Sequence, residues 1–477
     1  MRGTEFISEL FAGRLAVLVF LLVVPGCAVL IDRMSAHDLS RVALVLVSAI
    51  CALAIAVDAI TSRSHKLYSP SVTLCAPAFF LLALVSVGHA PNPAAAAREF
   101  AMFFGLACIA AVIATSRSEG QFDTLATVVV SGALLYAALV LVIVLSAVAN
   151  AGRVDPTLVI PGYDNYRLFN HVQTVMLPLL ALVTTQAIRG GALARIAWIA
   201  LTIHLALLAF TLGRATAISM VGAVLMSLLL FRRGALLQVR QLLIGAALAA
   251  LLYLFVFVAL PLIAGSSTRA LVPGGLSGLQ SDHSRLFLWH LALDYVAQEP
   301  WLGIGPMHYA HYLNPKAAHP HSIYLQLASE WGLPMLMGVV AICAWGAWQM
   351  ARAIRACVDP ERATVGIALF TTMMAIAIDG LFSGNFVMPV SQMWIAVAVG
   401  WAIAWTRANA TAQLNSARRQ GYWPSASFAT LAIVSQVWLC WSIRTEVADL
   451  NAHLQQIGLD VSKSFTACPR FWSNGWF

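Results

Sequence analysis

Half of the chain's twelve histidines lie in one 39-residue window, where the sequence concentrates side chains capable of chemistry. The six are His283, His290, His308, His311, His319 and His321. An imidazole group can ligate a metal ion or accept a proton near neutral pH. The HExxH pattern of zinc enzymes is absent, and the prolines that flank His308 and His311 leave little room for a chelating helical pair. We therefore expect no metal site and no cofactor, and packing at the membrane interface for most of these histidines, with His321 as the one placed to accept a proton.

Three arginines are candidates for binding phosphate groups. Arg214 follows a glycine between two apolar runs, Arg285 lies in the histidine window, and Arg167 lies in the segment Tyr163–His171. A guanidinium group is permanently charged and can bind two phosphate oxygens at once. The alternative is that each side chain extends to lipid headgroups, or, for Arg167, that it pairs with Asp164. A lysine could replace an arginine that only reaches headgroups, but not one that binds two oxygens.

Composition decides the class of protein that must position these groups. Of the 477 residues, 60% are hydrophobic and only 10% are charged, and the mean hydropathy is +0.83. A soluble domain carries about 25% charged residues, so this chain has too few charges to cover a water-facing surface. A soluble enzyme, a disordered regulator and a secreted disulfide scaffold are excluded. The fold class that we predict is an all-α polytopic integral membrane protein.

The net charge of +8 and the eight cysteines do not change this assignment. The basic residues are spread between apolar runs, as orientation in a membrane requires, and do not form a stripe typical of nucleic-acid binding. We therefore expect no nucleic-acid partner. Six cysteines lie inside apolar segments and no CxxC pair is present, so neither a zinc site nor a disulfide framework is indicated.

The apolar runs predict twelve membrane spans and a weaker thirteenth, since a helix needs about 20 apolar residues to cross a membrane. Their approximate limits are 15–31, 41–60, 71–88, 100–115, 124–149, 171–188, 195–212, 215–231, 242–264, 322–351, 363–381, 387–406 and, for the weaker span, 426–443. The chain then divides into four parts. Residues 1–264 hold the first nine transmembrane helices, 265–321 form a large loop, 322–443 hold the remaining helices, and 444–477 form an amphipathic tail.

Lysine and arginine counts in the short loops set the orientation of the chain. With the N-terminus inside, sixteen basic residues fall in inner loops and nine in outer loops. We therefore expect a cytoplasmic N-terminus and an outward-facing loop over 265–321. Leu286, Trp289, Leu293 and Val296 recur at helical spacing in this loop, which predicts an amphipathic helix over 283–298 at the outer membrane surface.

His321 opens a segment that continues into the tenth span. A single helix over 321–351 would be about 46 Å long, which exceeds the roughly 30 Å of hydrocarbon. His321 would then reach the outer headgroup level, with Pro334 as the expected kink. Glu330 lies nine residues later, on the opposite helix face and about 13 Å along the axis. We expect Glu330 to bind a neighbouring helix or to orient another group, and not to form a dyad with His321.

Four motifs, in this order along the chain, resemble those of the O-antigen ligase and polymerase superfamily. The first two are Arg167-Leu168-Phe169-Asn170-His171 and Thr211-Leu212-Gly213-Arg214-Ala215. The third pairs Ser284-Arg285-Leu286-Phe287-Leu288-Trp289 with Pro300-Trp301-Leu302-Gly303-Ile304-Gly305, and the fourth combines His321, Ser322, Leu325, Glu330 and Gly332. The resemblance covers about residues 160–385. Ser322 stands where the family more often has asparagine.

The resemblance implies an inverting, metal-independent glycosyltransferase at the periplasmic face of the Gram-negative inner membrane. Its donor would be a glycan on undecaprenyl pyrophosphate, and the acceptor that we favour is lipid A-core oligosaccharide, as in an O-antigen ligase. Membrane lipid would surround the chain. His321 would be the general base, and Arg214, Arg285 and Arg167 would bind the diphosphate. The candidate supporting residues are His319, Tyr324, Asn170 and Glu330.

Other functions stay open at this point. With another lipid-linked repeat as acceptor the chain would be an O-antigen polymerase, and with protein hydroxyls it would be an O-oligosaccharyltransferase. A transporter of the same lipid-linked glycan is the alternative from another class, and it predicts ionisable residues in mid-membrane. Only Asp379 and Asp58 come near that position, and both lie towards the ends of spans.

Overall fold

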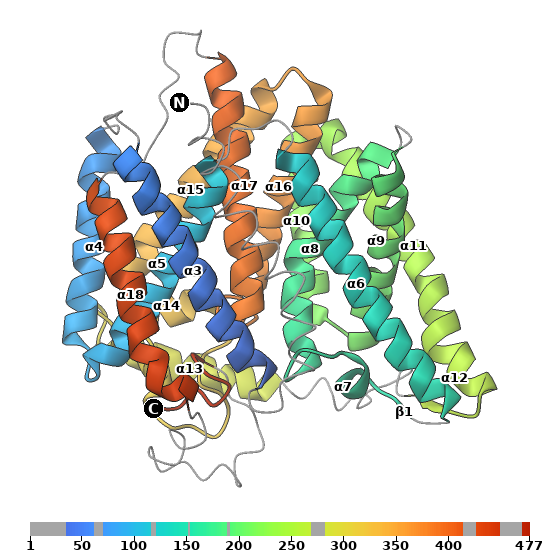
Figure 1. Cartoon of the computed structure of the whole chain (residues 1–477), viewed down its shortest axis with the longest axis horizontal. Helices are drawn as coiled ribbons and strands as arrows, with labels where there is room; N and C mark the ends of the chain where they lie inside the picture. Colours follow the sequence, from blue (N-terminus) through green and yellow to red (C-terminus); the bar gives the residue numbers. More distant parts are fainter. Residues whose placement is uncertain are drawn as a thin grey trace.

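Long helices that run side by side make up most of the chain (Figure 1). The computed structural model describes residues 35–61, 70–115, 121–150, 153–187, 191–268, 282–413, 426–448 and 470–477. Its long helices are α3 (Ala36–Thr61), α4 (Pro70–His89), α5 (Pro93–Thr115), α6 (Gln121–Ala149), α8 (Tyr166–Ala187), α9 (Ala192–Thr211), α10 (Arg214–Phe231), α11 (Leu236–Tyr253), α15 (Leu333–Ala356), α16 (Pro360–Asp379), α17 (Pro389–Gln413) and α18 (Ala426–Ala448). The first expected span, 15–31, lies outside the described residues.

Shorter elements join these helices. They are α7 (Pro156–Val159), α12 (Leu260–Ile263), α13 (Asp282–Gln298), α14 (Ile323–Trp331), the 3-10 helices η1 (Arg232–Ala235) and η4 (His308–Ala310), the π-helix η2 (Leu254–Ala259), and the parallel two-residue strands β1 (Arg153–Val154) and β2 (Ser267–Thr268). α7, α12, α13 and β1 gather at one end of the bundle in Figure 1, which we call the loop end. α13 follows the limits of the amphipathic helix expected over 283–298.

The described helices suit a lipid environment. Eight candidate spans are long and apolar enough to cross a membrane, and helices satisfy their own backbone polar groups, as the bilayer interior requires. Large apolar side chains such as Leu229, Leu251 and Ile263 are exposed on the outside of the bundle. These features confirm an all-α, multi-pass membrane protein. The full count of twelve spans stays a prediction, although the weaker span expected over 426–443 does form a helix, α18, packed against α3 and α5.

The prediction of one helix over 321–351 is wrong, because the chain breaks at Gly332 into two helices, α14 and α15. α14 ends at Trp331, α15 begins at the next residue after Gly332, and the φ of Gly332 is +85°. Pro334 lies in the first turn of α15, where a helix tolerates proline, so it does not kink a continuous helix. Ser322 caps α14, since its hydroxyl accepts a hydrogen bond from the Leu325 amide at 3.5 Å. This cap explains a serine at the position, because asparagine and serine are equally good N-caps.

Backbone hydrogen bonds tie the loop that follows α13 to the last turn of α14. The amides of Ile304 and Gly305 donate to the carbonyls of Ser329 and Glu330, at 2.8 and 3.1 Å. Glycines allow this close approach. A β-carbon at Gly303 would lie 2.3 Å from the Glu330 carbonyl carbon. The glycine motif near residue 303 therefore seats the loop directly against the backbone of α14.

We expect Gly303→Ala to destabilise the fold. Gly303 has a φ of +71° as well as no room for a β-carbon, and a left-handed conformation in a non-glycine residue costs about 1–3 kcal/mol. Gly346→Ala is the matched control, because no atom lies within 4 Å of a β-carbon there. Thermal unfolding in detergent should show a lower midpoint than the wild type for Gly303→Ala and an unchanged midpoint for the control. Equal midpoints would contradict the packing described here.

The segment Arg470–Phe477 lies at the loop end, against the start of α3. The amide and hydroxyl of Ser473 donate to the Asp38 carboxylate at 2.6 and 2.7 Å. The sequence predicts an amphipathic tail over 444–477. Residues 444–448 of it are the last residues of α18, and 449–469 lie outside the described residues. The described end of this tail is mostly buried. It is therefore part of the packed structure at the same end of the bundle as α13.

Candidate active site

His321 lies just before α14 in a backbone conformation that is uncommon for residues other than glycine. Its φ is +53°, in the left-handed region where histidine is among the enriched residues. The His321 amide donates to Nδ1 of His319 at 3.2 Å, and the two rings meet edge to face with centroids 4.1 Å apart. Such conformations persist only where the surroundings hold them, and they gather at active sites.

Hydrogen bonds from two other helices hold this stretch of chain. The indole nitrogen of Trp289, on α13, donates to the carbonyl of Pro320 at 3.1 Å. The Ile323 amide and the Tyr324 hydroxyl donate to carbonyls at the end of α16, both at 2.9 Å. Tyr324 thus supports the site by fixing the first turn of α14. His321 is positioned between α13 and α16.

Burial and two arginines keep His321 uncharged at neutral pH. Burial, followed by the positive charges of Arg285 and Arg167, lowers the pKa of His321 from 6.5 to about 4. Burial also lowers the pKa of His319. A neutral imidazole at pH 7 retains a nitrogen that can accept a proton. The charges that act on His321 therefore come from Arg285 and Arg167, which lie in other parts of the sequence.

Asn170 joins three helices beside this group. Its side-chain oxygen accepts from the Thr211 hydroxyl at 2.7 Å, and its carbonyl accepts from the Thr216 hydroxyl at 2.8 Å. Gly213 packs so closely that a β-carbon there would lie 2.9 Å from the Asn170 side chain. This junction makes Arg214 the first residue of α10, with its side chain exposed. Asn170 thus fixes the junction at which α10 begins.

His171 and Asp379 form a polar pair that is not among the site residues predicted from the sequence. His171 Nδ1 lies 3.8 Å from Asp379 Oδ2, which accepts a hydrogen bond from the Ser383 hydroxyl at 2.6 Å. The charge of Arg285 acts on both His171 and Asp379. The missed signal was the presence of ionisable residues at the ends of apolar spans, which in membrane proteins indicates a functional site by default.

Glu330 lies at the other end of α14 from His321. Its Oε1 accepts a hydrogen bond from the Tyr309 amide at 2.9 Å, and its Oε2 forms an ion pair with Arg470. Glu330 therefore binds neighbouring elements, as the helical spacing predicts, and is not the partner of His321.

The charges around His321 come from guanidinium groups. In the part of the chain that the structure describes, no group of three or more His, Cys, Asp or Glu side chains lies close enough to hold a metal ion. Arginines can stabilise the negative charge of a leaving diphosphate by themselves, because they supply fixed positive charge and paired donors. Metal independence stays a prediction.

A family model described as O-antigen ligase matches residues 197–340. This match supports the O-antigen ligase superfamily for this part of the chain. The matched region runs from α9 into α15 and contains Arg214, Arg285, His319 and His321, whereas Arg167 and Asn170 lie before it. No curated protein matches the chain.

The lowered pKa of His321 predicts an acid limit of activity at unusually low pH. kcat/KM reports the ionisation of the free enzyme, so activity should persist at pH 5 and fall as the pH decreases through about 4. Arg285→Gln removes a positive charge and should move this limit to higher pH. His290→Gln, exposed on α13, is the control and should leave it unchanged. A wild-type limit near 6.5, measured as kcat/KM for the donor against pH, would contradict the assignment of His321 as a buried base.

Proposed function

We propose that the chain is an O-antigen ligase, which transfers a glycan from undecaprenyl pyrophosphate to lipid A-core oligosaccharide at the periplasmic face of the inner membrane. The family match supports O-antigen ligase or polymerase-type activity on a lipid-linked glycan. The observation that supports the proposal is the stretch of chain at His321, held by hydrogen bonds between α13 and α16, where burial and the charges of Arg285 and Arg167 lower the pKa of His321. A base next to fixed cations suits a hydroxyl nucleophile and a diphosphate leaving group.

The proposed reaction is a single displacement. The acceptor hydroxyl attacks the anomeric carbon of the donor sugar while the bond from that carbon to the diphosphate oxygen breaks. The hydroxyl proton passes to His321, and undecaprenyl pyrophosphate leaves with its negative charge held by arginines. Because no covalent intermediate forms, the configuration at the anomeric carbon is inverted. The leaving group is already a diphosphate, so the step needs no nucleotide.

The arginines would have different parts in this reaction. Arg285, half-buried on α13, and Arg167, exposed on the first turn of α8, both act on the pKa of His321 by their charge and would contact the diphosphate close to the breaking bond. Arg214, exposed at the start of α10, would bind the far side of the same group. His319 would support His321 through its hydrogen bond to the His321 backbone.

The acceptor distinguishes this proposal from its alternatives. A polymerase would extend a second lipid-linked repeat, and an O-oligosaccharyltransferase would modify a protein hydroxyl. A transporter would move the donor without forming any new glycosidic bond. Incubating the purified protein with lipid-linked donor and each of the three acceptors in turn tests all four functions. Product on lipid A-core alone would support the ligase.

We expect His321→Ala to lose at least about 100-fold in transfer, because general-base catalysis contributes roughly 10²–10⁴-fold. His290→Ala, on an exposed position of α13, should retain normal turnover. Transfer to lipid A-core is measured in excess EDTA, so that wild-type activity also tests metal independence. Gel filtration and thermal unfolding check that both variants fold. Substantial turnover in folded His321→Ala would remove His321 from the reaction.

Arginine-to-lysine variants test whether the cations bind phosphate oxygens in pairs. Lysine keeps the charge but lacks the planar fork, so Arg285→Lys and Arg214→Lys should each lose about tenfold or more, or about 1.4 kcal/mol. The loss should appear in the kinetics of the donor and hardly in those of the acceptor. Arg352→Lys is the control, since Arg352 lies over the Trp348 ring on α15. Near-normal donor kinetics for both variants would mean that the diphosphate is held elsewhere.

A further inference from the structure

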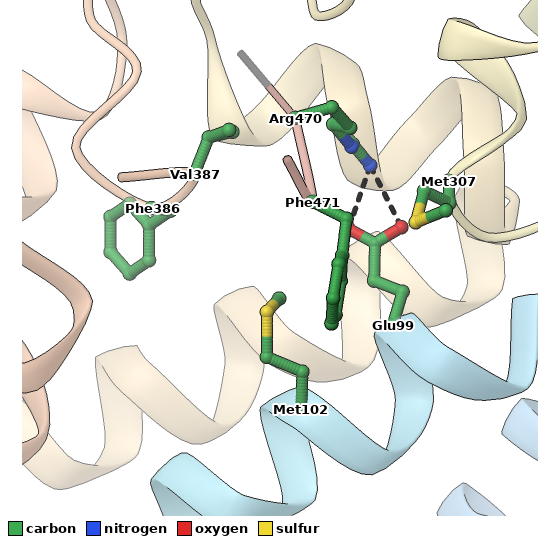
Figure 2. A pocket seen from close by; sticks show the side chains of 7 residues that line it. All are labelled: Glu99, Met102, Met307, Phe386, Val387, Arg470 and Phe471. Carbon is green, nitrogen blue, oxygen red and sulfur yellow. Dashed lines mark hydrogen bonds and ion pairs between the residues drawn. The ribbon is translucent and has the colours of Figure 1, made fainter. Parts of the chain in front are cut away.

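Arg470 lies inside the bundle at the loop end and joins two helices that are distant in sequence. Its Nη2 donates to both carboxylate oxygens of Glu99 on α5, at 2.6 and 2.8 Å, and also to Glu330 on α14. Figure 2 shows the Arg470 side chain directed at the Glu99 carboxylate. Each of the three residues is at most 3% exposed. One guanidinium group therefore connects α5 to the helix that begins at His321.

The segment that carries Arg470 is itself fixed along its length. Arg41, fully buried on α3, donates to the carbonyls of Arg470 and Phe471 at 3.0 and 2.9 Å. The Trp472 indole donates to Glu446 on α18 at 3.0 Å. These contacts set the depth of the Arg470 side chain, so its guanidinium group cannot follow α14 if that helix moves.

The surroundings of the ion pairs are mostly apolar. Besides Glu99 and Arg470, a small cavity is lined by Met102, Met307, Phe386, Val387 and Phe471 (Figure 2). The ion pairs therefore lie in a confined, mostly apolar surrounding, and removing one partner of a buried ion pair is strongly destabilising.

We propose that Arg470 is a positioning residue for the reaction: by pairing with Glu99 and Glu330 at once, it fixes the end of α14 and so keeps His321, at the start of that helix, in its place between α13 and α16. The helix is only nine residues long, and a short rigid helix transmits a shift at one end to the other. The effect on transfer rests on the proposed function, whereas the effect on the buried charges does not.

The charges make this role distinguishable from ordinary packing. Without Arg470, two buried carboxylates that now share one nitrogen would face each other and repel, so that one of them takes up a proton as the pH falls. Burial raises the pKa of Glu330, Arg470 opposes this effect, and Glu99 adds to it. Removing Arg470 leaves burial and Glu99, which favour proton uptake by Glu330, against the hydrogen bond from the Tyr309 amide, which opposes it. The other titratable groups around this cluster are His37, Asp38 and Arg41 on α3, Arg98 on α5, Glu446 on α18, and His308, Tyr309, His311 and His319 in the loop.

Arg470→Met is the test variant, since methionine keeps apolar bulk and removes the charge. At pH 8 it should lose at least tenfold in transfer to lipid A-core relative to the wild type. Lowering the pH to 6 should restore much of this loss, because one carboxyl group then takes up a proton while His321 stays uncharged. Adding Glu330→Gln to Arg470→Met removes one of the two carboxylates and should restore transfer at pH 8. Arg470→Lys keeps the positive charge and should be less impaired than Arg470→Met.

Arg98→Met is the matched control, because the guanidinium group of Arg98, the residue next to Glu99, donates to Glu446 at 2.7 Å and to the Ser442 carbonyl at 2.6 Å, both on α18. Its transfer should not depend on pH between 6 and 8, and Glu330→Gln should not improve it. The proposal is overturned if Arg470→Met transfers normally at pH 8, or if its loss is restored neither by pH 6 nor by Glu330→Gln.

Thermal unfolding separates this proposal from the proposed function. Acidification from pH 8 to pH 6 should raise the unfolding temperature of Arg470→Met more than that of the wild type, because its folded state binds the extra proton. If the wild type shows no transfer, the ligase proposal fails and this comparison still decides whether the carboxylates depend on Arg470. Equal shifts in both proteins would overturn the positioning role.

Discussion

Hydrogen bonding between the loop backbone and the last turn of α14 is the constraint on which the loop end depends. In an apolar bundle no water replaces a lost backbone partner, so these groups must meet within the protein. Gly303 and Gly332 leave the space for this contact, and the left-handed conformation of Gly332 separates α14 from α15. α14 can then follow its contacts with α13 and α16, while α15 runs on as a separate and mostly exposed helix.

α14 separates two groups of charge with different physical roles. At its start, cations surround an uncharged His321, an arrangement that favours an anionic ligand and leaves a base available. At its end, Glu330 and Glu99 share the guanidinium group of Arg470 in a buried and mostly apolar interior. The first group is partly open and suited to chemistry. The second is closed and suited to holding the helix, because a buried ion pair resists displacement.

The helical spacing of single segments was sufficient for several correct expectations. It predicted α13, and it excluded Glu330 as the partner of His321, since both follow from the number of residues per turn. It failed at Gly332, where the pattern of apolar residues continues across the break and Pro334 suggested a kink instead. The break depends on the close approach of Trp301 to Gly332, whose missing β-carbon would lie 2.2 Å from the Trp301 carbonyl oxygen. No local pattern reports such a contact.

The sequence by itself determined the class of protein, the helical nature of its spans and the superfamily of its central region, because apolar runs, net charge and short motifs are local properties of the chain. Only the tertiary structure decided which charges meet. It placed Arg285 and Arg167 beside His321, paired His171 with Asp379, and brought Arg470 to Glu330. These pairings join residues from distant parts of the chain, and their distances depend on how whole helices pack, which the spacing of residues within one segment does not specify.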